Sequence, residues 1–379
     1  MKALVVSGIW PPDVGGPASH APDVAAYLCA RGHAVEVVTT AAAAPAREDY
    51  PVRWAPRSLP KGVLHVRTAA LVRERARHAD VVYTTGMFGR SSAGAALARR
   101  PYVVKLTADP AFERARRRGE VGGTVDEFQE NGGGIRGAAY RRARDLELRH
   151  AFHVFCPSAW LRDLAISWGL DRDRVSVLPN PTPLAADLRP RDELKRELSL
   201  NGATLAFAGR LTAQKSLEVA LEAVAQSDGV RLLVAGEGDE RPRLERRAQE
   251  LGLGDRVRFL GAQPRSRVVE LLAAADAMIL SSSWENFPHT VVESLAAGTP
   301  VVATATGGVA EVVEDGVNGL LVPAGDPAAL AQAVRRYFGD AELRERLRAA
   351  AAPSVAKYAP ERVFARLEEV LAAAAASRA

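Results

Sequence analysis

The fold class follows from residues 3–39, which read ALVVSGIWPPDVGGPASHAPDVAAYLCARGHAVEVVT. The apolar run 3–7 is typical of a strand, and the Gly- and Pro-rich residues 8–17 predict a loop after it. We expect a helix over 18–31 and a second strand over 34–39. A strand, a helix and a strand in this order pair in parallel through a right-handed crossover. The opening therefore predicts an α/β fold.

Two series of short apolar segments continue this pattern. Because these segments do not alternate with polar residues, they favour strands that helices cover on both faces. The proline-rich residues 180–190 separate the two series and predict a linker. The predicted strands are 81–84, 102–106, 153–156 and 175–178 in the first series, and 204–208, 231–235, 257–260, 277–280, 300–303 and 320–322 in the second.

This pattern predicts two domains, each built on a parallel sheet. We expect a first domain over 1–182, a second over 183–360 and a C-terminal helix over 361–379, which could pack back on the first domain. Ligands of open parallel sheets bind at the carboxyl ends of the strands. We therefore expect the two domains to face each other across a cleft that holds the active site.

The composition excludes several classes of protein. Of the 379 residues, 47% are hydrophobic and 25% are charged, which excludes a disordered or fibrous chain. The net charge is only +5, so we expect no nucleic-acid partner. Cys29 and Cys156 are too few for a disulfide framework, which fits a reducing cytoplasm. No run approaches the ~18 apolar residues of a membrane span, so we expect a soluble protein with at most peripheral membrane contact.

Residues 282–303, which read SSWENFPHTVVESLAAGTPVVA, carry the richest chemistry. A helix is expected to open near Pro288 and to end at Gly298. The free N–H groups of its first turn form an anion site that suits a phosphate, and Glu293 can reach hydroxyl groups beyond it. Glu285 and Glu293 stand eight positions apart, so we do not expect them to form a metal pair. The alternative is that both are surface carboxylates of an ordinary helix.

A second stretch, residues 207–215, supplies positive charge. Gly209 follows a predicted strand, and Arg210 and Lys215 lie around the start of the next helix. Two cations in this position can clamp a diphosphate. The two stretches together imply a ligand that carries phosphate.

The order of these motifs along the chain resembles that of the retaining glycosyltransferases of family 4, whose GT-B architecture consists of two Rossmann-like domains. The resemblance covers nearly the whole chain. It rests on residues 11–17 (PPDVGGP), 31–33 (RGH), 177–180 (VLPN), 209–211 (GRL) with Lys215, 236–238 (GEG), and the E-x7-E motif of Glu285 and Glu293. The fold that the resemblance implies is the two-domain α/β fold that the strand pattern predicts.

The resemblance also implies roles for single residues. Arg210 and Lys215 would bind the donor diphosphate and stabilise the leaving nucleotide. Glu293 would hold the ribose hydroxyls, and Glu285 would lie near the donor sugar and take part in catalysis. The remaining donor-binding positions that it implies are Gly15, Gly16, Gly209, Gly236, Asn286, Phe287, Pro288, His289 and Thr290.

The chain departs from the family pattern in the first domain. Many relatives place a histidine after the strand that corresponds to residues 103–106, whereas this chain has Thr107, Ala108 and Asp109 there. Asp109 is our candidate for the polar contact in the cleft and for a catalytic role, with Thr107 as the alternative. Pro181 follows Asn180 where glycine is usual, which would stiffen the hinge.

The sequence therefore predicts a hexosyltransferase that moves a sugar from a nucleoside diphosphate sugar, with UDP as the expected nucleotide, to an acceptor hydroxyl. The resemblance implies retention of configuration by a front-face mechanism, without a metal or another cofactor. The Ala- and Arg-rich composition suggests a bacterium, in which the acceptor would belong to a glycan or to a secondary metabolite such as an aminoglycoside. The alternatives are a nucleotide-sugar 2-epimerase of the same fold and a non-catalytic nucleotide-binding module.

Overall fold

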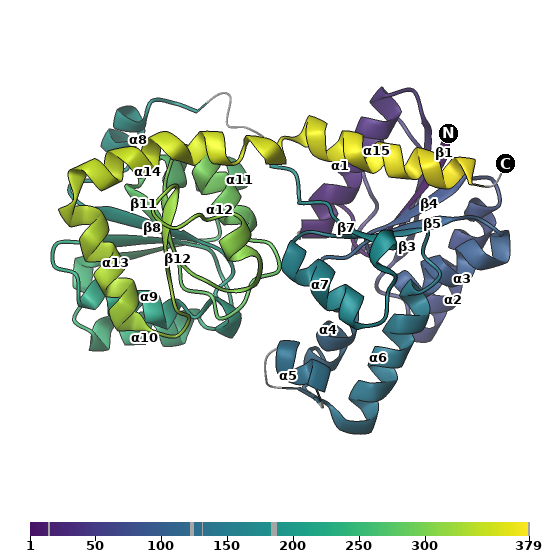
Figure 1. The fold of residues 1–379 in the computed structure, drawn as a ribbon, viewed down its shortest axis with the longest axis horizontal. Coiled ribbons are helices and arrows are strands. Elements are labelled where there is room, and N and C mark those ends of the chain that lie inside the picture. Colours follow the sequence, from purple (N-terminus) through teal and green to yellow (C-terminus); the bar gives the residue numbers. More distant parts are fainter. Residues whose placement is uncertain (14–15, 122–124, 131, 183–187, 378–379) are drawn as a thin grey trace. The chain divides into compact units, whose positions relative to one another are not determined.

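A computed structural model describes residues 1–13, 16–121, 125–130, 132–182 and 188–377. The chain divides into two compact units, unit 1 with residues 1–181 and 361–379, and unit 2 with residues 182–360 (Figure 1). The division falls within one residue of the predicted boundary at 182. The C-terminal helical segment belongs to unit 1.

Unit 1 is built on a seven-stranded parallel sheet with the strand order β3-β2-β1-β4-β5-β6-β7. Its strands are β1 (Lys2–Ser7), β2 (Ala34–Ala41), β3 (Val52–Pro56), β4 (Val81–Thr84), β5 (Tyr102–Lys105), β6 (His153–Cys156) and β7 (Val175–Val177). Its helices are α1 (Gly16–Ala30), α2 (Lys61–Ala76), α3 (Phe88–Ala98), α4 (Pro110–Arg116), α5 (Val125–Glu130), α6 (Gly134–Leu148), α7 (Ala159–Ser167) and α15 (Pro360–Ala376).

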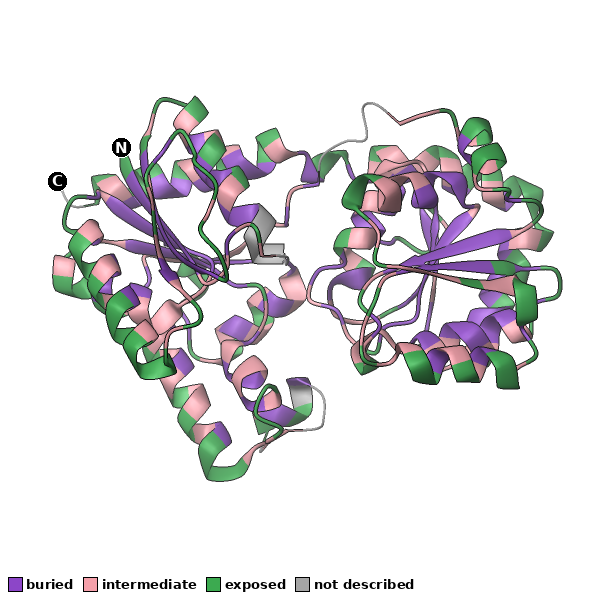
Figure 2. Ribbon diagram, turned by 180° about the vertical axis from the view of Figure 1, so that it is seen from behind, coloured by how far each residue is buried: buried purple, intermediate pink, exposed green. Residues whose placement is uncertain are grey.

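Helices cover the sheet of unit 1 on both faces, as the unalternated strands predict. One layer of the core lies between the sheet, α1 and α15, and the other lies between the sheet, α2, α3, α6 and α7. Strand interiors are accordingly buried, while exposed residues gather on the outer sides of the helices (Figure 2). The sequence analysis did not predict β3. Only Ala55 of this edge strand is buried, so its sequence lacks the apolar run that marks the central strands.

The C-terminal helix α15 completes the core of unit 1. Val363, Phe364, Leu367 and Leu371 recur at helical spacing and are buried against α1 and the sheet. Glu368 of the same helix accepts hydrogen bonds from Tyr27 at 3.1 Å and from Arg31 at 3.3 Å, and its other oxygen lies 2.7 Å from His33 Nε2. The Arg-Gly-His segment at 31–33 is thus a docking point for α15.

Unit 2 is built on a six-stranded parallel sheet with the order β10-β9-β8-β11-β12-β13. Its strands are β8 (Thr204–Ala208), β9 (Arg231–Ala235), β10 (Val257–Gly261), β11 (Ala277–Leu280), β12 (Val301–Thr304) and β13 (Gly319–Val322). Its helices are α8 (Arg191–Glu197), α9 (Leu217–Ala225), α10 (Arg241–Glu250), α11 (Arg265–Ala274), α12 (His289–Ala296), α13 (Pro327–Gly339) and α14 (Ala341–Ser354). All six strands lie within a residue or two of the predicted ranges.

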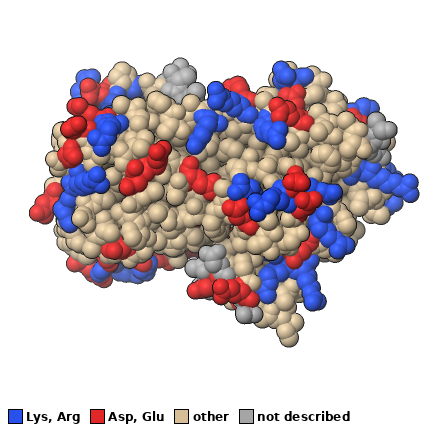
Figure 3. All heavy atoms as spheres, viewed as in Figure 1, with Lys and Arg blue, Asp and Glu red and all other residues tan. Residues whose placement is uncertain are grey.

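Charged side chains of both signs lie beside one another on the face that Figure 3 shows. Arg189, for example, contacts Glu193, Glu197 and Glu270. Such mixing is what the nearly balanced composition predicts.

Candidate functional site

The loops after β8 and β9 are joined by backbone hydrogen bonds at the carboxyl edge of the unit 2 sheet. Gly209 N donates to Ala235 O at 3.0 Å, and Leu211 N donates to Glu237 O at 2.8 Å. Gly236 has a φ of 145°, and a Cβ on it would lie 1.8 Å from Gly209 O. Only glycine fits such a close approach of two backbones. The two loops therefore form one rigid support for Arg210.

Lys215 and Glu285, predicted from separate stretches of sequence, form an ion pair. Lys215 ends a short 3₁₀ helix, Ala213–Lys215, and its Nζ lies 2.5 Å from Glu285 Oε1. Ser282 Oγ donates to the same oxygen at 2.7 Å. The side chains of Lys215 and Glu285 are 16% and 7% exposed, so the pair is largely shielded but still reaches the surface.

The loop that carries Glu285 is held to its surroundings by residues that the sequence analysis did not single out. Gln214 Nε2 donates to Trp284 O at 3.0 Å, which ties the Lys215 turn to this loop. Thr304 Oγ1 donates to Ser282 O at 2.7 Å. A Cβ at Gly307 would lie 1.9 Å from the carbonyl oxygen of Glu285. These contacts join residues far apart in sequence, so no local pattern could have revealed them.

Arg210 differs from Lys215 in having a free head group. Its residue is exposed, and within the described part of the chain its guanidinium makes no hydrogen bond or ion pair. The site thus holds one available cation and one cation that a carboxylate occupies. Together they can neutralise a dianionic diphosphate if the ligand takes the place of Glu285 at Lys215.

Glu293 lies in α12, one residue past its first turn, as predicted. Its side chain is 12% exposed, and its Oε1 accepts a hydrogen bond from Nε of Arg265 at 2.9 Å and forms an ion pair with Nη2 of the same arginine at 2.9 Å. Burial raises the pKa of Glu293, and the positive charge of Arg265 partly opposes this rise. Arg265, the first residue of α11, was not among the predicted site residues.

Other residues that were predicted to bind the donor lie around the start of α12. The helix begins at His289 after Pro288, and Gly298 follows it with a φ of 76°, as predicted. Phe287 is buried, with its ring edge-on to those of His289 and Tyr358 at 5.6 and 5.5 Å. The His289 amide already donates to Phe287 O at 3.1 Å, whereas its side chain is exposed. Asn286 and Thr290 are half-buried.

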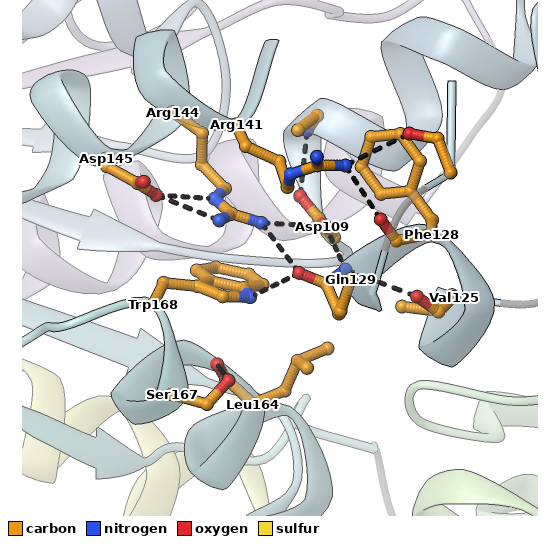
Figure 4. Close-up of polar contacts among 12 residues, drawn as sticks. Asp109, Val125, Phe128, Gln129, Arg141, Arg144, Asp145, Leu164, Ser167 and Trp168 are labelled. Carbon is orange, nitrogen blue, oxygen red and sulfur yellow. Dashed lines mark hydrogen bonds and ion pairs between the residues drawn. The ribbon is translucent and has the colours of Figure 1, made fainter. Parts of the chain in front are cut away.

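Of the unit 1 candidates, Asp109 has a carboxylate whose two oxygens both accept hydrogen bonds from unit 1 residues (Figure 4). It caps α4 by accepting from Ala111 N at 2.8 Å, and its other oxygen accepts from Gln129 at 2.8 Å and Arg144 at 3.0 Å. Its side chain is 0% exposed. The guanidinium of Arg144 in turn lies 3.8 Å from the ring centre of Trp168. These contacts favour a structural role for Asp109, and the alternative candidate Thr107 is exposed.

The two glycines of the first loop are placed only in part. Gly15 lies outside the described residues, and Gly16 is the first residue of α1. In the described residues no three His, Cys, Asp or Glu side chains are grouped as a metal would require, and no helix is both long and apolar enough to cross a membrane.

The sequence analysis did not predict a buried amine at the carboxyl edge of the unit 1 sheet. Lys105, at the end of β5, is fully buried and donates to Leu178 O. Burial lowers its pKa to about 7. The same effect raises the pKa of the Cys156 thiol, on the adjacent strand β6, to about 12.

Comparisons with known proteins agree with this architecture. Residues 15–181 match the model of the "Glycosyl transferase 4-like domain" family, and residues 190–353 match that of "Glycosyl transferases group 1". A lipopolysaccharide core biosynthesis glycosyltransferase of Rhizobium meliloti is 38% identical over 41% of this chain and 45% of its own length. A D-inositol 3-phosphate glycosyltransferase of Nocardia farcinica is 36% identical over 49% of this chain and 44% of its own. The matched regions thus span about half the length of these curated relatives.

Solved structures match over nearly the full length. Anabaena HepE, in its complex with UDP-glucose, has a TM-score of 0.80 at 21% identity over 98% of this chain and 100% of its own. Sucrose-phosphate synthase from Thermosynechococcus elongatus has a TM-score of 0.80 at 22% identity over all of both chains. At these identities the likeness shows the fold, which is GT-B. Because a glycosyltransferase family model matches each of its two units, the chain belongs to the family-4-like glycosyltransferases of the GT-B fold.

Proposed function

We propose that the protein transfers a sugar from a UDP-sugar to an acceptor hydroxyl, with retention of the anomeric configuration and without a metal ion. The observation that carries this proposal is the Lys215–Glu285 ion pair at the carboxyl edge of the unit 2 sheet, beside the loop that carries Arg210, where a Cβ on Gly209 would lie 3.5 Å from Lys215 Cε. An available arginine beside a lysine that can exchange its carboxylate partner is a site for two negative charges.

The binding step is an exchange of partners. Donor phosphate oxygens would displace Glu285 from Lys215, and Arg210 would bind the same diphosphate from its rigid loop. Glu285, still held by Ser282, would then be free to accept hydrogen bonds from hydroxyls of the donor sugar. These positive charges oppose the negative charge that develops on the nucleoside diphosphate as its bond to the sugar breaks.

For the transfer itself we propose a front-face reaction. The acceptor oxygen forms its bond to the anomeric carbon on the face from which the diphosphate leaves. The departing phosphate oxygen takes the proton of the acceptor hydroxyl, so atoms and charges balance without a covalent enzyme intermediate. Arg210 and Lys215 supply the positive charge that a metal ion supplies in other transferases, which is our reason for proposing that no metal is needed.

The comparisons support the choice of donor. HepE, whose solved complexes contain UDP and UDP-glucose, shares the fold over almost the whole chain. Glu293 is suited to the ribose, because a carboxylate can accept hydrogen bonds from two neighbouring hydroxyls. For the acceptor we propose a bacterial glycan or a secondary metabolite. The Rhizobium meliloti relative is described as an enzyme of lipopolysaccharide core biosynthesis.

The test is a screen of nucleoside diphosphate sugars against glycan and aminoglycoside acceptors, read by mass spectrometry, with the product anomer assigned by NMR. We expect transfer from a UDP-sugar, an unchanged anomeric configuration and full activity in EDTA. Loss of transfer in EDTA, restored by a divalent ion, would contradict metal independence. Donor binding by calorimetry without any transfer would instead favour a non-catalytic module, and interconversion of the free UDP-sugar would favour an epimerase.

A further inference from the structure

Arg265 contacts Glu293 in an asymmetric way. Its Nε donates a hydrogen bond to Glu293 Oε1 at 2.9 Å, and its Nη2 forms an ion pair with the same oxygen at 2.9 Å. Glu293 Oε2 is therefore left to other partners. The arginine side chain is 55% exposed, whereas that of the glutamate is 12% exposed, so Arg265 approaches a shielded carboxylate from the surface.

In the part of the chain that the structure describes, no other charged side chain takes part in this contact. Helix α12 packs against α11, α14, β11 and β12, and the two strands carry no charged residue. On α11, Arg267 and Glu270 pair with each other and with residues of the α8 region. On α14, Arg344 and Arg348 donate to backbone carbonyls, and Glu342, Glu345 and Arg346 are exposed. Among the described residues, Arg265 is thus the charged group that contacts Glu293.

This isolation has an electrostatic consequence. Burial raises the pKa of Glu293, and Arg265 is the group that counteracts it. A protonated Glu293 would have one oxygen fewer to accept hydrogen bonds and no charge to strengthen them. Arg265 therefore favours the ionised form of Glu293, which accepts hydrogen bonds from hydroxyls more strongly than the protonated form.

We propose that Arg265 is a positioning residue of the donor site, which keeps Glu293 charged and holds Oε1, so that Oε2 faces the donor nucleotide. The inference rests on the proposed role of Glu293 at the ribose. It adds to the donor site a residue outside the E-x7-E motif. That residue, Arg265, keeps the second carboxylate of the motif, Glu293, ionised.

The first test does not need a ligand. The carboxyl ¹³C resonance of Glu293, assigned by its loss in Glu293→Gln, is followed against pH in the parent, Arg265→Ala, Arg265→Lys and Arg267→Ala. We expect the titration midpoint to rise in Arg265→Ala, to stay near the parent's in Arg265→Lys, and not to move in Arg267→Ala, which removes a cation from the same helix. An unchanged midpoint in Arg265→Ala overturns the proposal.

The second test measures UDP binding by calorimetry between pH 5.5 and 8. A ligand that needs the carboxylate loses about tenfold in affinity for each pH unit below the pKa of that group. Because removing Arg265 raises the pKa of Glu293 further, we expect Arg265→Ala to bind UDP more weakly than the parent at pH 5.5, with a ratio of the two affinities that shrinks toward pH 8. In the Glu293→Gln background, residue 293 has no titratable group. Adding Arg265→Ala to this background should therefore leave the pH profile of UDP affinity unchanged.

The outcomes separate this inference from the proposed function. If the loss of affinity in Arg265→Ala is the same at every pH, the arginine is only structural and the inference fails, while the donor site stands. If the parent does not bind UDP at any pH, the proposed function fails, and the ribose role of this pair fails with it. Thermal unfolding of each variant checks that the fold is retained.

Discussion

Among the described residues, a shielded ion pair lies at the carboxyl edge of each sheet, and the two pairs are built differently. In unit 1, Asp109 and Arg144 are 0% and 3% exposed. Both oxygens of Asp109 are occupied, and Arg144 also contacts Asp145 and Gln129. In unit 2, Lys215 and Glu285 are 16% and 7% exposed, and the two described partners of the carboxylate, Lys215 and Ser282, contact the same oxygen.

This difference in exposure and in hydrogen bonding distinguishes a structural ion pair from one whose carboxylate a ligand can replace. A sealed pair with every polar atom occupied cannot give up a partner without leaving a buried charge unpaired, which is strongly destabilising. A pair that reaches the surface through its cation can replace the carboxylate by another anion. Sequence position alone does not distinguish the two, since both lie just after predicted strands. We expect substitutions in the first pair to change stability and those in the second to change activity.

The largest effect is expected in the sealed pair. Asp109→Ala removes the cap of α4 and leaves Arg144 buried without its main partner, so the free energy of unfolding should fall by about 3 to 5 kcal/mol. Urea unfolding followed by circular dichroism measures this. The activity per folded molecule should remain near that of the parent, and a folded Asp109→Ala protein with no activity would return Asp109 to the catalytic residues.

The next effect is expected on turnover. Arg210→Ala and Lys215→Ala each remove one positive charge from the leaving diphosphate, which should cost about 2 to 4 kcal/mol in transition-state stabilisation, or roughly 30- to 1000-fold in kcat/KM. Arg231→Ala is the control, since Arg231 is exposed at the opposite end of the same sheet. Near-parental turnover in both variants, measured by product formation, would show that the two cations do not bind the diphosphate.

A smaller effect is expected on nucleotide affinity. Glu293→Ala removes hydrogen bonds between a charged acceptor and the ribose, each worth about 1.5 to 3 kcal/mol, so the Kd for UDP should rise about tenfold or more. Glu293→Gln should lose less, because it keeps one acceptor. Calorimetry with UDP alone measures both. Equal affinities in parent and Glu293→Ala would make this residue structural.

The last effect is on the pH dependence of stability and concerns Lys105, a buried amine without a carboxylate partner among the described residues. Its pKa of about 7 lies below the usual value of 10.5, so above pH 7 the unfolded chain binds more protons than the folded one. Stability should therefore rise with pH between about 7 and 10.5, by at most ~1.4 kcal/mol per pH unit. Lys105→Met should flatten this rise in urea unfolding measured across that range. The same slope in parent and variant would contradict it.

Much of the fold was predictable from the sequence, because central strands that are buried on both faces appear in it as uninterrupted apolar runs. The strands of unit 2 are short apolar runs that match the observed ones closely, and the spacing of Val363, Leu367 and Leu371 predicts the terminal helix. Edge strand β3 was missed because few of its side chains are buried. Glycines such as Gly236 mark close backbone approaches and were identified as parts of motifs.

The sequence by itself determined which residues follow the strands of each sheet, and so which side chains are available at its carboxyl edge. Only the tertiary structure decided how these side chains pair. Lys215 contacts Glu285 across 70 positions, Arg144 contacts Asp109 across 35, and Arg265 contacts Glu293 across 28. Local pattern cannot specify such contacts, because they depend on which helices and loops the sheet brings together. Burial around each pair then determines whether its charge is sealed into the structure or open to exchange with a ligand.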